Sequence, residues 1–395
     1  MLTHRQLFFN HLAQTGKTPL ALKIEKAQGI YLYDTKGKKY IDLISGISVS
    51  NIGHRHPKVV EAVKKQADKY LHLMVYGEYI QSPQVQLAKA LIALLPKNLN
   101  SVYLVNSGAE AVEGALKLAK RYTGRTEIIS CKNAYHGSTH GALSVTGNEE
   151  LKNAFRPLLP NVSFIEYNNL KDLEKITLKT ACVITETIQG EAGAVLPEKD
   201  YLKKIRKKCS ETGTLLILDE VQCGFGRTGK LFAFQHFGIT PDILCIAKGM
   251  GGGMPIGAFV SSKKIMNSLT ENPALGHITT FGGHPVSCAA ALAALNVLKK
   301  EKLSEQARKK ELLFRKLLKH SKIKRITGKG LLLAVHFDNA AYNKKVIEKC
   351  VKNGLIVDWF LFCDTAMRLA PPLNITESQA KEVCEIIIKC LDQTS

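Results

Sequence analysis

The 395-residue sequence has no apolar run approaching the roughly 18 consecutive residues that a membrane-spanning helix needs. Residues 1–6 carry charge, but no apolar segment of signal-peptide length follows them. Internal repeats and low-complexity tracts are also missing. With 45% apolar and 23% charged residues, the composition is typical of a globular protein. We therefore expect a cytoplasmic location and no membrane partner.

Cysteines are present, but none forms a Cys-x-x-Cys pair, so the usual pattern of a zinc or redox site is absent from the sequence. Cys182, Cys245 and Cys288 lie inside apolar runs, which favours buried, reduced thiols over disulfide bonds. His54 and His56 form an isolated His-x-His pair with no cluster of further ligands. We therefore predict no metal site.

Acidic residues are few, since 34 Asp and Glu stand against 55 Lys and Arg, for a formal net charge of +21. Such an excess can indicate nucleic-acid binding. However, the basic residues at 203–208, 299–302 and 308–310 fall on the polar faces of segments with helical periodicity. No basic stripe with interleaved aromatics accompanies them. We therefore predict solvated helix faces and no nucleic-acid partner, although the positive field would attract anionic substrates.

Between residues 100 and 262, short apolar runs alternate with helical patterns. Nearly continuous apolar strands separated by helices are typical of a largely parallel sheet covered on both faces. Ligands of such sheets collect at the carboxyl ends of the strands. The predicted strands are 102–105, 127–130, 163–165, 182–185, 215–218, 243–246 and 257–260.

The two ends of the chain have other patterns, and the chain is too long for one ordinary core. Residues 29–43 predict a β-hairpin that turns at 34–37. The carboxyl-terminal part predicts helices at 286–300, 304–320, 342–353 and 376–392 around strands at 331–337 and 355–359. We therefore predict an amino-terminal segment, 1–50, that joins the smaller domain, a large domain, 51–285, and a smaller α+β domain, 286–395.

Lys248 ends the apolar run 243–247 and opens a glycine-rich loop. Poor hydration lowers the pKa of a lysine and leaves a nucleophilic amine near neutral pH. Earlier in the chain, Asp219 ends the apolar strand 215–218, where a carboxylate is costly unless it is paired or caps a helix. An amine that can form a Schiff base, with a carboxylate that can pair with a pyridinium nitrogen, is the minimum equipment for pyridoxal phosphate chemistry.

Ser107, Gly108 and Ala109 follow a predicted strand and open a predicted helix. Free backbone N–H groups at such a position can bind a phosphate. Ser107 and Glu110 also fit a capping box, which needs no ligand, and both interpretations can hold together.

Two further segments follow predicted strands. Tyr135, beside a glycine turn, could cover one face of a planar ring, or it could be an ordinary turn residue. Glu186 and Glu191 could orient a cofactor or a substrate, or they could be solvated turn acids. No single motif decides between these alternatives. The conjunction favours a cofactor site, because a phosphate cradle, a stacking aromatic, an acid and a lysine follow one another along one sheet edge.

The order of these motifs resembles the class III aminotransferases of the ornithine, acetylornithine and GABA type, within the fold-type I pyridoxal phosphate enzymes. The resemblance extends from Gly29 to the carboxyl-terminal helix. It implies an α/β fold-type I transferase whose large domain has a mostly parallel seven-stranded sheet, beside a smaller α+β domain. The motifs that carry it are 107–111, SGAEA; 135–137, YHG; 189–193, QGEAG; 218–222, LDEVQ; 247–249, AKG; and 368–372, RLAPP.

The resemblance also implies roles at a pyridoxal 5'-phosphate site. Lys248 would form the Schiff base and move the substrate proton, Asp219 would pair with the ring nitrogen, and Gln222 would bind the phenolic oxygen. Thr280 would reach the phosphate from the neighbouring subunit, which implies a homodimer with shared active sites. The other cofactor-binding residues would be Ser107, Gly108 and Ala109 at the phosphate and Tyr135, His136, Glu186 and Val221 around the ring.

For the substrate, the resemblance implies that Glu191 pairs with Arg368 while an ω-amine donor is bound. Arg368 would then bind the α-carboxylate of glutamate or 2-oxoglutarate. Ser138 departs from the pattern, because most members have an arginine there that grips the donor carboxylate, and a hydroxyl cannot replace a guanidinium. Ile47 stands where ornithine aminotransferase has a tyrosine, which favours the acetylornithine and GABA branches.

We therefore predict a pyridoxal-phosphate-dependent transaminase that works by a ping-pong mechanism. It would transfer an amino group from an ω-amine donor, with an acetylornithine-like compound as the first choice, to 2-oxoglutarate. The alternatives are the same chemistry with ornithine, GABA, a diamine or another amine, or a mutase, decarboxylase or racemase that uses the same cofactor.

Overall fold

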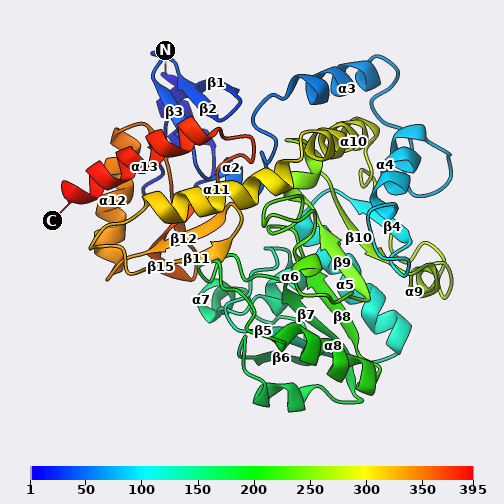
Figure 1. The fold of residues 1–395 in the computed structure, drawn as a ribbon. Helices are drawn as coiled ribbons and strands as arrows, with labels where there is room; N and C mark the ends of the chain where they lie inside the picture. The colour runs from blue at the N-terminus through cyan, green and yellow to red at the C-terminus, as the bar shows by residue number, and fades with distance from the viewer. Residues whose placement is uncertain (1, 395) are drawn as a thin grey trace.

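The computed structural model describes residues 2–394. Both ends of the chain lie together on one side of the molecule, and the middle of the chain forms a layered region on the other side (Figure 1). Helix α11 (Leu303–Leu317) lies on the side of the two chain ends, following α10 (Pro285–Lys300).

The layered region contains one seven-stranded sheet with the order β4-β10-β9-β8-β7-β5-β6. β10 pairs in antiparallel fashion with both β4 and β9, whereas the pairs from β9 to β6 are parallel. The predicted, mostly parallel seven-stranded sheet is therefore confirmed. Its strands are β4 (Ser101–Val105), β5 (Glu127–Cys131), β6 (Val162–Ile165), β7 (Thr180–Glu186), β8 (Leu215–Asp219), β9 (Ile243–Ile246) and β10 (Gly257–Ser261).

Strand β8 explains why these segments lack an alternating pattern. Leu216 and Leu218 belong to the core on one face of the sheet, and Leu215 and Ile217 belong to the core on the other. A strand covered on both faces needs apolar residues at every position. The covering helices include α5 (Gly108–Thr123), α6 (His140–Val145), α8 (Tyr201–Thr212) and α10, which packs on α3 (Pro57–Ala67) and α4 (Ser82–Ile92).

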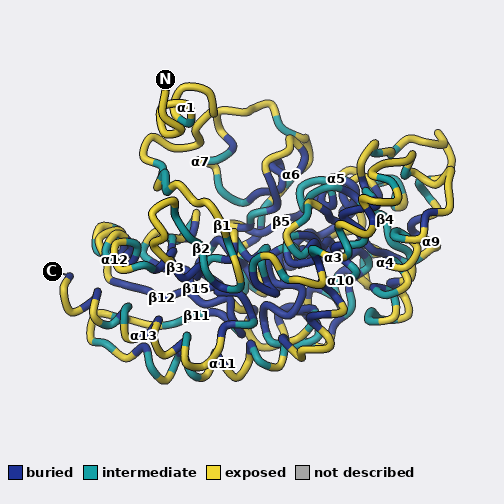
Figure 2. Tube along the Cα trace, turned by 90° about the horizontal axis from the view of Figure 1, so that it is seen from above, coloured by how far each residue is buried: buried dark blue, intermediate teal, exposed yellow. Residues whose placement is uncertain are grey.

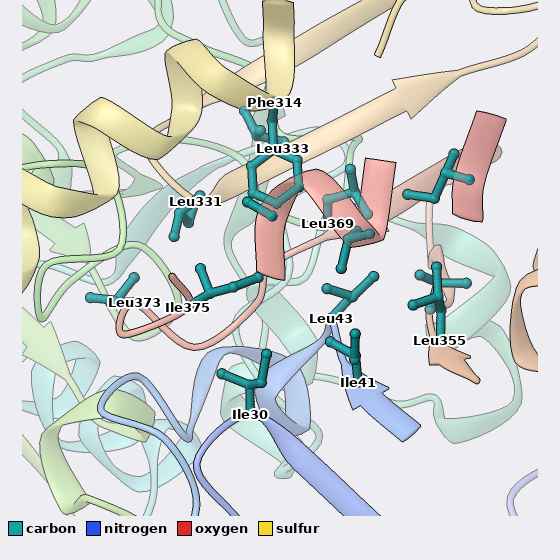
Figure 3. Packing of buried hydrophobic residues seen from close by; sticks show 14 of the residues in the cluster. Ile30, Ile41, Leu43, Phe314, Leu331, Leu333, Leu355, Leu369, Leu373 and Ile375 are labelled. Carbon is teal, nitrogen blue, oxygen red and sulfur yellow. The ribbon is translucent and has the colours of Figure 1, made fainter. Parts of the chain in front are cut away.

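The two chain ends build two four-stranded sheets over a shared core. Ile30, Ile41 and Leu43 from the amino-terminal end pack with Phe314 and Leu369 from the other end (Figure 3). The first sheet contains β1 (Ile24–Gln28), β2 (Tyr31–Asp34), β3 (Lys39–Asp42) and β13 (Leu355–Ile356). The second contains β11 (Arg325–Lys329), β12 (Leu332–His336), β15 (Cys363–Leu369) and β14 (Trp359–Phe360), and it packs with α11, α12 (Ala340–Lys352) and α13 (Glu377–Asp392). The predicted domain boundaries after residues 50 and 285 stay a prediction.

The prediction of one strand over 355–359 is wrong. Leu355 and Ile356 pair in parallel with β3, and Trp359 and Phe360 pair with β15 in the other sheet. Asp358 lies between them, and its carbonyl oxygen accepts the backbone N–H of Arg368. β1, β11 and β15 were not predicted, because their sequences mix polar and apolar residues without strict alternation. The short helices α1 (His4–His11), α2 (Ser45–Ser48), α7 (Glu149–Lys152) and α9 (Lys263–Met266) complete the α-helices of the described residues.

The basic helix faces are exposed, with one exception. Along α8, Lys203, Lys204 and Lys207 face solvent, as predicted. On α11, Lys309 is exposed, but Lys310 is buried and its Nζ donates to the carbonyl oxygen of Leu373 over 2.9 Å. Figure 2 shows how buried and exposed positions alternate along the outer helices.

All ten cysteines lie in the described part of the chain, where they are unpaired, and nine of them are buried, which agrees with the predicted reduced thiols. Within residues 2–394, no helix combines the length and the apolar character needed to cross a membrane. Over the same residues, no three His, Cys, Asp or Glu side chains gather as metal ligands would.

Candidate active site

A cavity of about 570 Å³ opens where the strands of the seven-stranded sheet end. Residues that follow β4, β5, β7, β8 and β9 line it, so the predicted edge of the sheet brings the motifs together. Thr280 and Arg368 are the two predicted residues outside this lining. The predicted residues that line the cavity are Ser107, Gly108, Ala109, Tyr135, His136, Ser138, Glu186, Glu191, Asp219, Val221, Gln222 and Lys248.

Asp219 lies at the floor of the cavity and is buried. His136 Nδ1 donates to its Oδ2 over 2.7 Å, and the backbone N–H of Val221 donates to its Oδ1 over 2.9 Å. No helix begins here, so Asp219 is not a helix cap but holds its own turn. A carboxylate has about four lone-pair positions, so it can accept one more N–H from the cavity.

Glu186 connects two turns at the cavity wall. One of its carboxylate oxygens accepts the backbone N–H of Tyr135 over 3.0 Å, and the other accepts that of Gly190 over 2.7 Å. Burial, with the neighbouring charge of Asp219, raises the pKa of Glu186 to about 8. This carboxyl group therefore positions the Tyr135 turn and is not a solvated acid.

The turn between β4 and α5 has the geometry of a helix amino terminus. Ser107 Oγ accepts the backbone N–H of Glu110 over 3.1 Å, but the Glu110 side chain returns to Asn106, not to Ser107. Only half of the predicted capping box is therefore formed. The remaining N–H groups of this first turn face an anion site, because the cavity lies at the positive end of α5.

Lys248 follows β9 directly and has φ of 48°, a left-handed conformation that is uncommon for a residue with a side chain. Burial lowers the pKa of Lys248, while the nearby carboxylates of Glu191 and Asp219 oppose that shift. Burial thus favours the neutral, nucleophilic form of the amine, which is the direction that the sequence predicts.

Glu191 and Arg368 form a buried pair beside the cavity. Arg368 Nη1 and Nη2 donate to the two carboxylate oxygens of Glu191 over 2.9 and 2.8 Å, and Gln222 Nε2 donates to Glu191 Oε1 over 2.9 Å. Burial alone would raise the pKa of Glu191, but the charge and hydrogen bonds of Arg368 lower it. Glu191 is thus ionised, lines the cavity and pairs with Arg368 behind it.

Thr280 is exposed and does not line the cavity. Its neighbour Thr279 is anchored there, because Asn106 Nδ2 donates to Thr279 Oγ1 over 3.2 Å. The segment that carries Thr280 is therefore fixed to the same turn that carries Ser107.

Several lining residues were not predicted from the sequence. Asn106 directly precedes the Ser107 motif and could have been found with it. Val49 follows a turn in which Ser45, Ile47 and Ser48 all have positive φ, and no sequence pattern signals such strain at a β-branched residue. The others are Ile188, Cys223, Gly253, Met254, Pro255 and Ile256, together with Gly137 and Ala247, which lie inside the sequence motifs.

The comparisons with known proteins agree with this geometry. The family described as "Aminotransferase class-III" matches residues 12–391. The chain is a class III aminotransferase. It is 41% identical to the acetylornithine aminotransferase of Methanocaldococcus jannaschii over 97% of this chain and 95% of that one. It is 40% identical to the corresponding protein of Archaeoglobus fulgidus over 96% and 97%.

Solved structures support the same fold. The ornithine aminotransferase of Toxoplasma gondii superposes with a TM-score of 0.91 at 32% identity and covers 98% of this chain and 93% of that one. The adenosylmethionine-8-amino-7-oxononanoate aminotransferase of Methanocaldococcus jannaschii has a TM-score of 0.91 at 31% identity over 99% of both chains. The predicted fold-type I architecture is therefore confirmed, and the aminotransferase depends on pyridoxal phosphate.

The cavity of this aminotransferase fits that cofactor. Two buried polar atoms at its wall, His136 Nε2 and Gln222 Oε1, have no hydrogen-bond partner. A side chain at Gly108 would lie 2.7 Å from Val221 Cγ1, so only glycine lets the start of α5 approach that wall. An anion-binding turn, a buried acid and a buried amine in one cavity match the phosphate, ring nitrogen and aldehyde of the cofactor.

Proposed function

We propose that this aminotransferase moves an amino group from an acetylornithine-like ω-amine donor to 2-oxoglutarate in a ping-pong cycle. The observation that carries the proposal is the bidentate Glu191–Arg368 pair next to Lys248. Such a pair lets one cavity accept the uncharged aliphatic chain of an ω-amine donor in one half-reaction and the α-carboxylate of a 2-oxo acid in the other. The names of the acetylornithine aminotransferases at about 40% identity support the choice of donor.

The cofactor residues follow from the cavity. Lys248 would hold the aldehyde carbon of the cofactor and move the substrate proton, while Asp219, oriented by His136, would keep the ring nitrogen protonated. Bound pyridoxal phosphate supplies the electron sink for that proton transfer. The remaining contacts are Tyr135 and Val221 on the ring faces, Gln222 at the phenolic oxygen, Glu186 behind the Tyr135 turn, and Ser107, Gly108 and Ala109 at the phosphate.

Glu191 and Arg368 divide the two half-reactions between them. While Glu191 neutralises Arg368, the wall beside the donor carries no free guanidinium. When Glu191 turns away, Arg368 offers two parallel N–H groups to the α-carboxylate of the 2-oxo acid. A 2-oxo acid acceptor needs such a cation, so the pair favours transamination over a reaction without an acceptor.

The decisive experiment is a half-reaction with the purified holoenzyme and a donor panel of acetylornithine, ornithine, GABA and putrescine. Loss of the visible cofactor band with a donor, and its return with 2-oxoglutarate, is expected for acetylornithine above the others. Turnover of an amino acid without any acceptor would overturn the proposal and favour a mutase, decarboxylase or racemase.

Ser138 replaces the arginine with which most family members grip the donor carboxylate, so the donor either uses another cation or lacks that carboxylate. Its hydroxyl lies 3.2 Å from the Tyr135 hydroxyl and offers no charge. If this position governs donor choice, Ser138→Arg should raise kcat/KM for acetylornithine about tenfold, since a charged hydrogen bond contributes about 1.5–3 kcal/mol. An unchanged donor preference, with Ser138→Lys as the comparison, would contradict that role.

We also propose a homodimer in which Thr280 of one subunit binds the cofactor phosphate in the active site of the other subunit. A surface formed by residues 71–80 and 278–281 supports it, because Leu71, Leu73, Met74, Tyr79, Ile80, Ile278 and Phe281 are exposed there, with Ile80 96% exposed. The rings of His72 and Phe281, 4.8 Å apart, join its two segments beside Thr280. Ile80→Asp should shift sedimentation from dimer to monomer.

We also propose a cytoplasmic location, because ten unpaired cysteines suit a reducing compartment.

A further inference from the structure

Arg368 contacts two carboxylates, not one. Besides the bidentate pair with Glu191, its Nε lies 3.0 Å from Oδ1 of Asp358. That second contact is an ion pair without an aligned hydrogen bond. Nη2 also donates to the carbonyl oxygen of Trp359 over 3.2 Å, and the guanidinium stacks 4.6 Å from the ring centre of Phe360.

The cluster therefore carries one positive charge and two carboxylates. When Glu191 turns away to admit an acceptor, Arg368 is still neutralised by Asp358. An incoming carboxylate then meets a guanidinium whose charge is already balanced, with a second anion across it. Ionised Asp358 lowers the affinity for that carboxylate, and protonated Asp358 restores it.

We propose that Asp358 is a positioning residue that acts through Arg368 and makes binding of the 2-oxo acid depend on pH. The inference rests on the proposed role of Arg368 in the acceptor half-reaction. Asp358 contacts the Nε edge of Arg368, whereas the acceptor carboxylate would take the Nη edge that Glu191 holds, so Asp358 acts through the cation.

The charged groups around Asp358 fit this behaviour. Arg368 on β15 favours its ionised form, while Glu191 in the turn after β7 and Asp42 on β3, which pairs with His54 over 2.7 Å, disfavour it. Burial, which outweighs the attraction of Arg368, raises the pKa of Asp358 to about 6. Its side chain is 25% exposed, so a proton can reach it from solvent.

The sign of the effect follows from that pKa. Below about pH 6 Asp358 is protonated, and the cluster with ionised Glu191 is neutral overall. The acceptor carboxylate therefore binds better at low pH. As pH rises through that value, the KM for 2-oxoglutarate rises. Because the two anions lie on different edges of one guanidinium, the change should be about fivefold.

Asp358→Asn tests the proposal, because it keeps the size of the side chain and the backbone hydrogen bond while it removes the charge. The KM for 2-oxoglutarate at about pH 7.5 should fall about fivefold, and its rise between about pH 5.5 and about pH 7.5 should flatten relative to the wild type. Asp364→Asn, an exposed carboxylate on the same strand β15, is the matched control and should leave both unchanged.

The outcomes separate this inference from the proposed function. If wild-type holoenzyme transaminates 2-oxoglutarate but Asp358→Asn has the wild-type KM and pH profile, the inference fails alone. If wild-type holoenzyme transfers no amino group to 2-oxoglutarate, the proposed function fails. The wild-type pH profile provides a second test should Asp358→Asn not fold, since a KM that is flat across that range overturns the role of Asp358.

Discussion

The two halves of the active site are built in different ways. The cofactor half takes its residues from turns that follow β4, β5, β7, β8 and β9 of one sheet. The carboxylate half joins Glu191, from the turn after β7, to Arg368, on β15 of a separate four-stranded sheet. The first half needs only correct strand order, whereas the second needs two sheets to be placed correctly against each other.

The difference shows in what holds each half. Asp219 and Glu186 accept backbone N–H groups from their own or neighbouring turns. Glu191 depends on contacts from the far sheet, because Arg368 and the backbone N–H of Leu361 both donate to it. We therefore expect changes in the far sheet to alter substrate binding before they alter cofactor binding.

The largest expected effect tests the cofactor half. Lys248→Ala removes both the covalent link and the proton carrier, so kcat/KM should fall by at least about 10³-fold. The visible absorption band of the bound cofactor should also disappear in this variant. Borohydride reduction followed by peptide mapping should label Lys248 in the wild type. Lys263→Ala, at an exposed lysine, is the matched control and should retain both activity and the band. A label on any lysine other than Lys248 would contradict the assignment.

The next effect tests the carboxylate half. Arg368→Lys keeps the charge but loses the fork of two parallel N–H groups, so the KM for 2-oxoglutarate should rise about 10²-fold. The visible band of the cofactor should be retained, which separates this half from the first. Arg325→Lys, an exposed change in the same sheet, should behave as wild type. Equal loss of cofactor and acceptor binding would show that the two halves are not independent.

The smallest effect concerns the contact that joins the halves. His336 Nε2 lies 2.7 Å from Thr327 Oγ1, which donates to the carbonyl oxygen of Gly193 in the Glu191 turn. Burial lowers the pKa of His336 from 6.5 to about 4. The folded state thus holds fewer protons than the unfolded chain between these values, so stability is full above pH 6.5 and falls as pH drops toward about 4.

His336→Gln should remove the pH dependence that His336 contributes. The acid-induced loss of unfolding free energy should therefore be smaller by about 2 kcal/mol. Urea unfolding at a series of pH values measures the difference. His11→Gln, on the exposed amino-terminal helix, is the control. Identical pH slopes for His336→Gln and the wild type would show that the imidazole is not kept neutral by the fold.

The sequence determined the seven strands, the edge where the motifs meet, and the residues of the cofactor half, because apolar strands and the glycine-bearing turns after them are local patterns. The mixed strands β11 and β15, the division of 355–359 between two sheets, and the burial of Lys310 were decided only in three dimensions.

The contacts of Arg368 with Glu191 and Asp358, like the strained turn before Val49, also belong to the tertiary structure. Asp358 belongs to no sequence motif. It lies ten positions before Arg368 in the chain and reaches that arginine only because β14 and β15 pair. Local propensity depends on neighbours along the chain, whereas the charge balance of a buried guanidinium depends on every carboxylate that packing brings within a few ångströms.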